Sequence, residues 1–482
     1  MAELENPSNK VGRIEEVGLE TIPESERKGK PSDLFMPWFA ANISVLGLSW
    51  GSWVLGFGLS FWQAVVVSIL GLFISFGLCG IIALLGKHGS APTLALSRAA
   101  FGYNGNRISA AISWILTVGW ETVLCITATL ATATVLREFG FDNQALSYVI
   151  GFVVVVGLAG AAGILGFDTI MKVQTWITWI TGILTVIYLI LVIPQINLSA
   201  VMAMPAGSLG ACIGALVMVM TGYGLGWVNA AADYSRYLPR HASSGGVVFW
   251  TTFSAALPCM ILVIFGILLV GSNPELGQAI DSDPIGALVT ILPFWFLIPF
   301  AVVAILGLVG GIIMDLYSSG LSLLATGVKI PRYVATSIDC VIMSVGTLLI
   351  VFLADNFLGP FQGFLTTLGV IIAAWAGIMI AEAFMRKEDY DQDSLYTPEG
   401  IYGSVNWKSL AILAVATIVG WGFVVNGAAP WLEWQGYFMD LIGGKEGPWA
   451  FSNLGVLFSL LIGLVGHMIL NRSDIAKQEG RR

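Results

Sequence analysis

The sequence of 482 residues contains little charge, little histidine and little cysteine. Only 11% of its residues are Asp, Glu, Lys or Arg, whereas a soluble globular chain carries roughly 25%, so a soluble globular protein is excluded. The three histidines are too scattered to bind a metal ion, and the five cysteines show neither metal-ligand spacing nor a disulfide framework. We therefore expect no metal ion and no cofactor.

The sequence also lacks the features of a receptor or a membrane enzyme. Its longest polar segment, residues 1–33, is too short for the ligand-binding domain of a receptor. An enzyme would place His, Cys or Asp in a cluster at mid-membrane or carry a nucleotide-binding loop, and neither pattern occurs. A non-transport receptor is kept only as a distant alternative.

Apolar residues make up 56% of the sequence and gather in long segments. About 20 apolar residues in a row span a bilayer as a helix, and twelve such segments are present. They are residues 34–58, 62–85, 109–135, 146–166, 173–194, 208–231, 247–271, 291–323, 333–354, 360–385, 408–427 and 451–470. The eighth is too long for one straight span and could include a loop helix.

The positions of Lys and Arg predict the orientation of these spans. With twelve spans both ends of the chain lie on one side, and that side receives 20 of the 22 Lys and Arg residues. Only Arg137 and Lys445 fall on the other side. We therefore expect a multi-pass protein of the plasma (inner) membrane, surrounded by lipid bilayer, with both termini in the cytoplasm.

Glycines interrupt the first and the sixth apolar segments. Gly222, Gly224 and Gly226 lie in the sixth, and the first contains several, among them Gly47 and Gly51. Each costs a helix about 1 kcal/mol relative to alanine, and a membrane helix keeps such a run where the freed backbone groups meet protein, ions or ligand. Discontinuous helices of this kind form transporter binding sites. The alternative is close packing of small residues against a neighbouring helix.

Two interrupted helices that lie five spans apart indicate two five-helix repeats. An odd number of spans inverts the second repeat relative to the first, so the two breaks meet in the middle of the membrane. The predicted fold is therefore all-α, with twelve transmembrane helices in a 5+5 inverted repeat, discontinuous helices 1 and 6, and two peripheral helices. The predicted parts are a cytoplasmic tail (1–33), the first repeat (34–194), the second repeat (208–385), a cytoplasmic loop (386–407), the peripheral helices (408–470) and a second cytoplasmic tail (471–482).

An ionisable residue inside an apolar segment is a functional candidate. Glu121 lies in the third segment, and helical spacing places Thr117, Trp120 and Leu124 on the same face. A planar, nitrogen-rich ring could stack on Trp120 and donate N–H groups to Glu121, and a buried carboxyl also suits proton coupling. The alternative is that Glu121 bonds a neighbouring helix as a structural link.

Two aspartates also fall inside apolar segments. Asp315 lies in the eighth segment and Asp339 in the ninth. Each is interpreted either as a proton relay or as the structural partner of a neighbouring helix.

Several short motifs occur in an order typical of a known family. They are Pro37–Asn42, Gly58–Gln63, Ser97–Tyr103, Val118–Trp120, Ala232–Pro239, Tyr317–Leu321, Ala381–Arg386 and Val405–Trp407. Over residues 14 to about 470 the chain resembles a bacterial purine–cytosine permease of the nucleobase:cation symporter-1 family.

The resemblance implies the inverted-repeat fold and the uptake of nucleobases or related planar amides, driven by Na⁺ or H⁺. It implies that the substrate lies between broken helices 1 and 6 and helices 3 and 8, with Trp120 stacked on its ring. The predicted substrate-binding residues are Leu46, Gly47, Thr117, Trp120, Glu121, Tyr223, Gly224, Trp227 and Asp315.

The sequence departs from the family pattern at two places. Gly224 stands where members often have an aromatic residue, so Tyr223 or Trp227 would supply the second stacking face. Residues 310–312, Gly-Gly-Ile, stand where Na⁺-coupled relatives place paired hydroxyls and an Asn, although Ser318 and Ser319 are close by. This favours H⁺ over Na⁺, with Glu121 or Asp315 as the titrating group.

These observations predict a secondary active transporter that imports a nucleobase of the cytosine or purine type by cation symport and alternating access. The alternative is the same mechanism with another small heterocycle, such as a hydantoin, allantoin or a thiamine precursor. We expect a monomer that does not bind nucleic acid.

Overall fold

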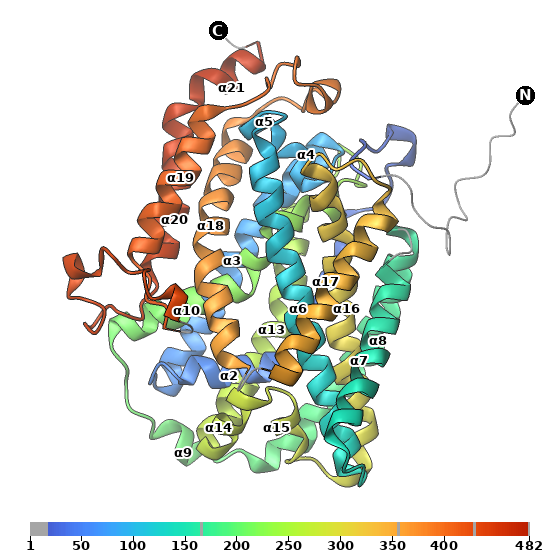
Figure 1. The fold of residues 1–482 in the computed structure, drawn as a ribbon, viewed down its shortest axis with the longest axis vertical. Coiled ribbons are helices and arrows are strands. Elements are labelled where there is room, and N and C mark those ends of the chain that lie inside the picture. The colour runs from blue at the N-terminus through green and yellow to red at the C-terminus, as the bar shows by residue number, and fades with distance from the viewer. Residues whose placement is uncertain (1–17, 164–166, 354–356, 428–429, 481–482) are drawn as a thin grey trace, which may run out of the picture.

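The structure, a computed structural model, describes residues 18–163, 167–353, 357–427 and 430–480. Within these ranges every regular element is a helix, and the long helices run side by side in one bundle (Figure 1). The helices of the bundle are α1 (Phe35–Asn42), α2 (Leu46–Leu55), α3 (Phe61–Gly89), α6 (Asn106–Glu138), α7 (Gln144–Gly163), α8 (Phe167–Val192), α10 (Leu209–Gly222), α11 (Gly224–Trp227), α12 (Ala231–Ser235), α13 (Ser244–Ser272), α16 (Leu297–Ala325), α17 (Arg332–Leu353), α18 (Leu358–Met385), α19 (Trp407–Gly422) and α20 (Leu454–Leu470).

Short helices lie at the two ends of the bundle. They are α4 (Thr93–Leu96), α5 (Arg98–Phe101), α9 (Leu198–Met202), α14 (Pro274–Ser282), α15 (Gly286–Val289) and α21 (Arg472–Gln478). The length of the eighth apolar segment is explained by a 3₁₀ turn, Phe294–Phe296, which directly precedes α16.

The predicted all-α membrane fold is confirmed. In the described ranges nine helices are long and apolar enough to cross a membrane, and counting each of two bent helix pairs as one span raises this number to eleven. The remaining predicted segment forms α19, which has 16 residues and is shorter than a full span.

The first predicted span is broken, as the glycines indicated. α1 ends at Asn42 and α2 begins at Leu46, and the helices before and after this break differ in direction by 69°. The side-chain amide of Asn42 donates a hydrogen bond to Trp38 O at 2.9 Å. The last turn of α1 therefore keeps one of its carbonyl groups bonded although the helix stops there.

The sixth span is broken as well. α10 ends at Gly222, and Tyr223 has φ −114° and ψ −101°, outside the helical region. The chain then forms the single turn α11, a 3₁₀ turn over Val228–Ala230 and α12. Because every residue from Thr221 to Ser235 except Gly222 is buried, the irregular backbone is covered by protein, as the bilayer requires.

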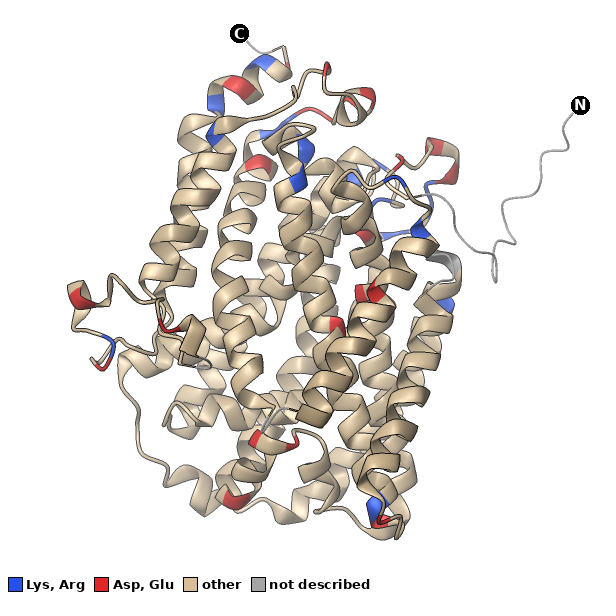
Figure 2. Ribbon diagram, viewed as in Figure 1, with Lys and Arg blue, Asp and Glu red and all other residues tan. Residues whose placement is uncertain are grey.

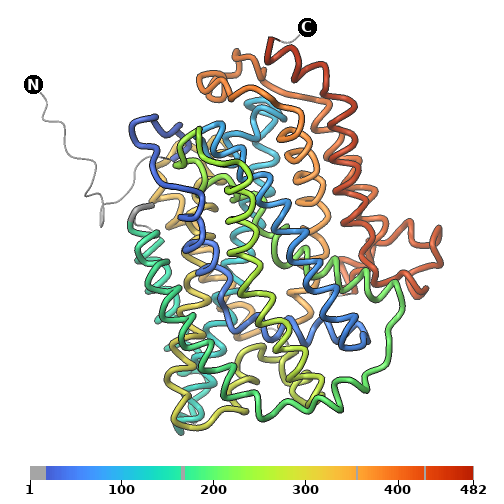
Figure 3. Tube along the Cα trace, turned by 180° about the vertical axis from the view of Figure 1, so that it is seen from behind, coloured from blue at the N-terminus to red at the C-terminus, as the bar shows by residue number. Residues whose placement is uncertain are grey.

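The predicted peripheral helices α19 and α20 lie at one edge of the bundle, beside α18 (Figures 1 and 3). α20 crosses α18 closely, because Gly463 of α20 meets the backbone of Ala374 and Gly377 of α18 meets the backbone of Leu460. Glycine at these two crossing points lets the helix backbones approach each other.

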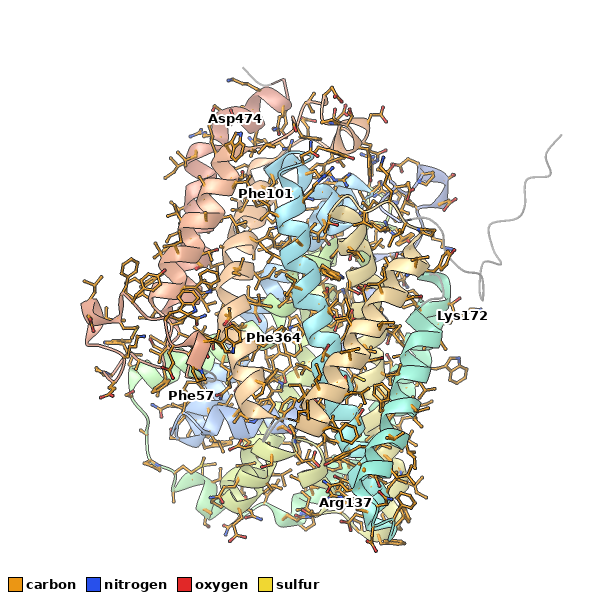
Figure 4. The ribbon with its side chains drawn as sticks, viewed as in Figure 1. Phe57, Phe101, Arg137, Lys172, Phe364 and Asp474 are labelled. Carbon is orange, nitrogen blue, oxygen red and sulfur yellow. The ribbon has the colours of Figure 1, made fainter. Side chains whose placement is uncertain are left out.

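The basic residues gather at one end of the bundle. Figure 2 shows most of the Lys and Arg ribbon at the end where α21 and the described N-terminal segment lie. Arg137 lies at the opposite end (Figure 4), in agreement with the predicted charge asymmetry.

The N-terminal segment is tied to the basic end of the bundle by ion pairs. Arg240 binds Glu24 at 2.5 Å and also binds Asp389 of the loop after α18. The Arg240 guanidinium holds the pKa of the Glu24 carboxyl below its ordinary value. The guanidinium of Arg27 donates a hydrogen bond to Leu238 O at 2.8 Å. This end of the bundle is therefore covered by a chain segment that the hydropathy pattern alone did not place.

Candidate functional site

The breaks in the first and sixth spans line one small cavity in the interior of the bundle. Its volume is about 60 Å³. It is lined by Ala41, Asn42, Ser44, Leu46, Gly47 and Trp50 of the first span, Trp120 and Leu124 of α6, Gly222, Tyr223, Gly226 and Trp227 of the sixth span, and Asp315 of α16. The two discontinuous helices therefore face each other, with α6 and α16 completing the wall.

Aromatic side chains form most of this wall. The rings of Trp50 and Tyr223 lie 4.8 Å apart with an angle of 44° between their planes. Trp120 and Trp227 are both at least nine-tenths buried. The Trp120 ring is supported edge to face by Phe361 and Phe364 of α18, at 5.7 and 5.9 Å. Phe364 lies at mid-height of the bundle (Figure 4). The cavity thus offers rigid ring faces on several sides.

Asp315 is the acidic group of the cavity. Its side chain is 3% exposed, and in the described ranges it takes part in no hydrogen bond or ion pair. A buried carboxyl without a partner is costly, whereas one that accepts N–H hydrogen bonds is stabilised. The cavity is therefore suited to a flat ring that carries N–H donors on its edge.

The predicted residues of the third span fall into two groups, one that lines the cavity and one that does not. Trp120 and Leu124, four residues apart, line the cavity, whereas Thr117 and Glu121 do not. The Thr117 hydroxyl donates to Ser113 O of its own helix at 3.0 Å. The four residues share one broad face of α6, but the cavity reaches only the part of this face that carries Trp120 and Leu124, and Thr117 and Glu121 face away from it.

Glu121 belongs to the second group and is fully buried. Neither of its carboxyl oxygens has a hydrogen-bond partner. It lies beside Ser319 and is also close to Asp339. The hydroxyl of Ser319 donates to Asp339 at 2.8 Å and not to Glu121. Glu121 therefore lies against the neighbouring helix α16 at Ser319 without a hydrogen bond to the carboxyl oxygens in the described ranges.

The other predicted residues likewise include some that line the cavity and one that does not. Leu46, Gly47, Tyr223 and Trp227 line the cavity. Gly224 does not, because it packs against the backbone of α3 next to Ser75, whose Oγ accepts a hydrogen bond from Gly224 N at 3.2 Å. The predicted glycine packing and the predicted break are thus both present in the sixth span.

Gly222 makes room for Trp50. A Cβ atom at Gly222 would overlap the Trp50 ring, whose side chain is 2% exposed and has little space to move. We expect Gly222→Ala to lower stability by about 1–3 kcal/mol, the usual effect of overpacking, and to lower the melting temperature of the purified protein. Gly77→Ala is the matched control, because a Cβ atom at Gly77 would have no neighbour within 4 Å. Equal melting temperatures for the two variants would contradict this account.

A wide vestibule of about 1400 Å³ lies between the cavity and the end of the bundle opposite the basic residues. It is lined by residues of α9, α14 and α18 and by Trp53. Trp53 packs against Trp50 at 5.2 Å and against Phe361 at 5.1 Å. Because Trp50 lines the cavity and Trp53 lines the vestibule, these three aromatic side chains separate the two spaces.

The predicted substrate-binding residues did not include Trp50, Asn42 or Leu124, although helical spacing placed Leu124 on the same face as Trp120. Trp50 could have been found, because a tryptophan beside Gly47 and Gly51 stands out in the first span. Leu124 carries no polar signal, and only the packing of α6 places it in the wall.

Residues 21–437 match the family described as permeases for cytosine/purines, uracil, thiamine and allantoin. The chain belongs to this family. It is therefore a membrane transport protein and not an enzyme, and the predicted resemblance is confirmed.

Individual relatives support the assignment along the whole permease. It is 23% identical to the putative purine-cytosine permease YxlA of Bacillus subtilis, over 97% of this chain and 98% of the relative. It is also 23% identical to the purine-cytosine permease FCY2 of Saccharomyces cerevisiae, over 92% of this chain and 84% of that one.

Two solved structures show the same fold. The first is Mhp1, a nucleobase-cation-symport-1 family transporter, in a closed conformation with bromovinylhydantoin bound. It matches 98% of this permease and 99% of its own chain, with a TM-score of 0.67 and 20% identity. The second, a Na⁺-coupled sialic acid symporter, matches 92% of this permease and 90% of its own chain, with a TM-score of 0.58 and 11% identity. Both likenesses concern the fold.

Proposed function

We propose that this permease imports a nucleobase of the cytosine or purine type by symport with H⁺. The observation that carries the proposal is the pairing of aromatic walls with the unpartnered carboxyl of Asp315 in one buried cavity. Nucleobases are flat, have two aromatic faces and carry N–H donors on their edges. A site of this chemistry selects such a ring over an aliphatic solute of equal size.

The substrate ring lies against Trp120, with Tyr223 or Trp227 on its second face, and an N–H group of the ring donates to Asp315 and so stabilises the ionised form of this carboxyl group. Stacking of a base on an aromatic side chain contributes about 1–3 kcal/mol. A hydrogen bond to a charged group adds about 1.5–3 kcal/mol. Together these contributions discriminate strongly against a ring without an N–H group, because the buried carboxylate is then left without a donor.

The residues of α16 that face the end of α1 favour H⁺ over Na⁺ as the coupling ion. A Cβ atom at Gly310 would lie 3.2 Å from Ala40 O, and one at Gly311 would lie 3.6 Å from Ala41 O. These carbonyls therefore face glycines, which carry no hydroxyl group, and the side-chain oxygen near Gly310 is the amide Oε1 of Gln174, 3.4 Å from the position that its Cβ atom would take. Coupling to H⁺ requires only a carboxyl group, which the interior of the bundle supplies.

The proposed orientation places the basic end of the bundle, with both termini, in the cytoplasm of a cell bounded by the plasma (inner) membrane. The vestibule then opens outward, and the Trp50–Trp53–Phe361 cluster lies between it and the binding cavity. Alternating access moves the repeats so that this aromatic separation opens on one side and the α12 region opens on the other. The proposed transporting unit is a monomer.

The deciding experiment is uptake of labelled cytosine, adenine and uracil into vesicles that contain the purified permease. We expect uptake to rise when the vesicle interior is made alkaline and to be unaffected by an imposed Na⁺ gradient. Vesicles in which the pH gradient is collapsed by a protonophore are the control. Uptake that follows the Na⁺ gradient would overturn the H⁺ assignment, and absence of uptake of every base would overturn the nucleobase assignment.

A second candidate substrate is another small heterocycle. The family description includes allantoin and thiamine, and the structurally similar Mhp1 was solved with a substituted hydantoin. A thermal-shift panel of bases, hydantoins and allantoin distinguishes these ligands. A shift with hydantoin and none with any base would favour this alternative.

A further inference from the structure

We propose that the transported proton binds outside the substrate cavity, at a carboxyl pair formed by Glu121 of α6 and Asp339 of α17 and bridged by Ser319 of α16. The inference rests on the proposed H⁺-coupled function. It assigns separate roles to the interior carboxyl groups: Asp315 binds the substrate, and the pair carries the proton.

The hydrogen-bond donors around Asp339 stabilise a negative charge on its carboxyl group. Its Oδ1 accepts a hydrogen bond from the Trp114 indole N–H at 2.7 Å, and its Oδ2 accepts one from the Ser319 hydroxyl at 2.8 Å. Both carboxyl oxygens thus receive a donor, although the residue is fully buried. A carboxylate that accepts hydrogen bonds at both oxygens is stabilised as the anion.

Glu121 has the opposite surroundings. It is fully buried, and no donor reaches either of its oxygens. An ionised carboxyl in such a place is very costly, whereas the protonated form needs only one acceptor. The oxygen of Ser319 lies beside Glu121 and still has lone pairs free, because the serine proton is given to Asp339. Protonated Glu121 can therefore donate to Ser319, which donates to Asp339.

Among the described residues, no Lys, Arg or His forms a hydrogen bond or ion pair with Glu121 or Asp339. Every ionisable group that bears on Glu121 from the packed helices is acidic or a thiol. These groups are Asp315 of α16, Asp339 and Cys340 of α17, and Cys125 of α6 itself. Two carboxylates without a cation repel each other, so the pair retains one shared proton.

Of the basic residues on the packed helices, Arg332 at the start of α17 is buried, and its guanidinium lies 5.0 Å from the centroid of the Tyr317 ring. α7 contains no Asp, Glu, Lys, Arg, His or Cys, and the one charged residue of α18, Glu382, is paired with Arg386 at 2.5 Å at the basic end.

A line of hydroxyl groups leads from the pair towards the basic end. Ser322, one turn after Ser319 on α16, lies 3.0 Å from Ser113 of α6. Ser113 also accepts a hydrogen bond from the side-chain amide of Asn229 at 2.7 Å. A proton that leaves Glu121 breaks its O–H bond there and forms one at Ser319, while the original serine proton moves to Asp339. The number of protons and the total charge of the pair are unchanged by this transfer.

The pair is linked to the substrate through the backbone of α6. Trp120 lines the cavity, and Glu121 is the next residue of the same helix but faces α16 and α17. A movement of α6 that closes the cavity on the ring therefore also moves Glu121 relative to Ser319 and Asp339. Substrate binding and proton binding are thereby coupled without direct contact.

Two measurements on the reconstituted permease test the assignment. Wild type is expected to accumulate base about tenfold per unit of pH gradient if one proton accompanies each base. Glu121→Gln is expected to give no accumulation but to retain exchange of internal for external base at equal pH, with unchanged affinity. Asp339→Asn should behave in the same way, and Glu121→Asp should restore part of the accumulation.

The matched control is Glu138→Gln, an exposed glutamate at the end of the same helix, which should accumulate base like wild type. Proton uptake by the vesicles, followed with a pH-sensitive dye, should accompany base uptake in wild type and be absent in Glu121→Gln. The inference is overturned if Glu121→Gln still accumulates base under a pH gradient, or if it loses exchange together with accumulation. If wild type shows no base uptake at all, the proposed function fails and not merely the location of the proton site.

Discussion

Asp315→Asn is expected to weaken binding of the base by about 30-fold to several thousandfold, because removing one member of a buried, charged hydrogen bond costs about 2–5 kcal/mol. Asp315 lines the cavity and makes no other hydrogen bond in the described ranges. Its carboxylate is therefore available to the N–H edge of the substrate. Asparagine keeps the shape but loses the charge and places an NH₂ group where an acceptor is needed.

The measurement is exchange of labelled base at equal internal and external pH, which depends on substrate binding and not on proton coupling. Asp142→Asn, at an exposed loop position, is the control and should leave exchange unchanged. Asp315→Asn should keep the melting temperature of the unliganded protein, since no structural contact is removed. Wild-type affinity in this variant would remove Asp315 from the substrate site. Loss of accumulation with normal exchange would instead assign the proton to Asp315.

Much of the fold could be predicted from the sequence because the bilayer restricts the alternatives. Long apolar segments must be helices, and Lys and Arg show which ends lie together. The glycine run at 222–226 indicated the break that the structure places at Tyr223. The contacts of the N-terminal segment could not be predicted, since they depend on side chains from distant parts of the chain.

The site was predicted less completely, and α6 shows why. Residues 117, 120, 121 and 124 share one broad helical face, and the sequence does not say where a boundary divides it. The boundary depends on the angle at which α6 meets α16 and α17, which is a tertiary property. The structure places Trp120 in the cavity and turns Glu121 away from it. The acidic residue that lines the cavity is Asp315, for which the sequence left two roles open.

Trp120→Ala is expected to lower the affinity for the base by about 10- to 100-fold and to abolish measurable uptake at low substrate concentration. The loss of base stacking costs about 1–3 kcal/mol. The variant also leaves Phe361 and Phe364 without the ring that they support, so the opposite wall can relax into the space. Both effects act on binding, because Trp120 makes no hydrogen bond through its indole N–H in the described ranges.

The variants Trp120→Phe and Trp176→Ala distinguish the loss of stacking from a nonspecific effect of replacing a tryptophan. Phenylalanine keeps a ring face and should restore a large part of the affinity, whereas Trp176 is 71% exposed on the outside of the bundle and its loss should have no effect. The decisive quantity is the ratio of affinities of Trp120→Phe and Trp120→Ala, measured by exchange at equal pH. A ratio near one would mean that the ring face does not contact the substrate. A large ratio assigns the affinity to stacking, because the two variants share the same backbone, the same Asp315 and the same proton pair.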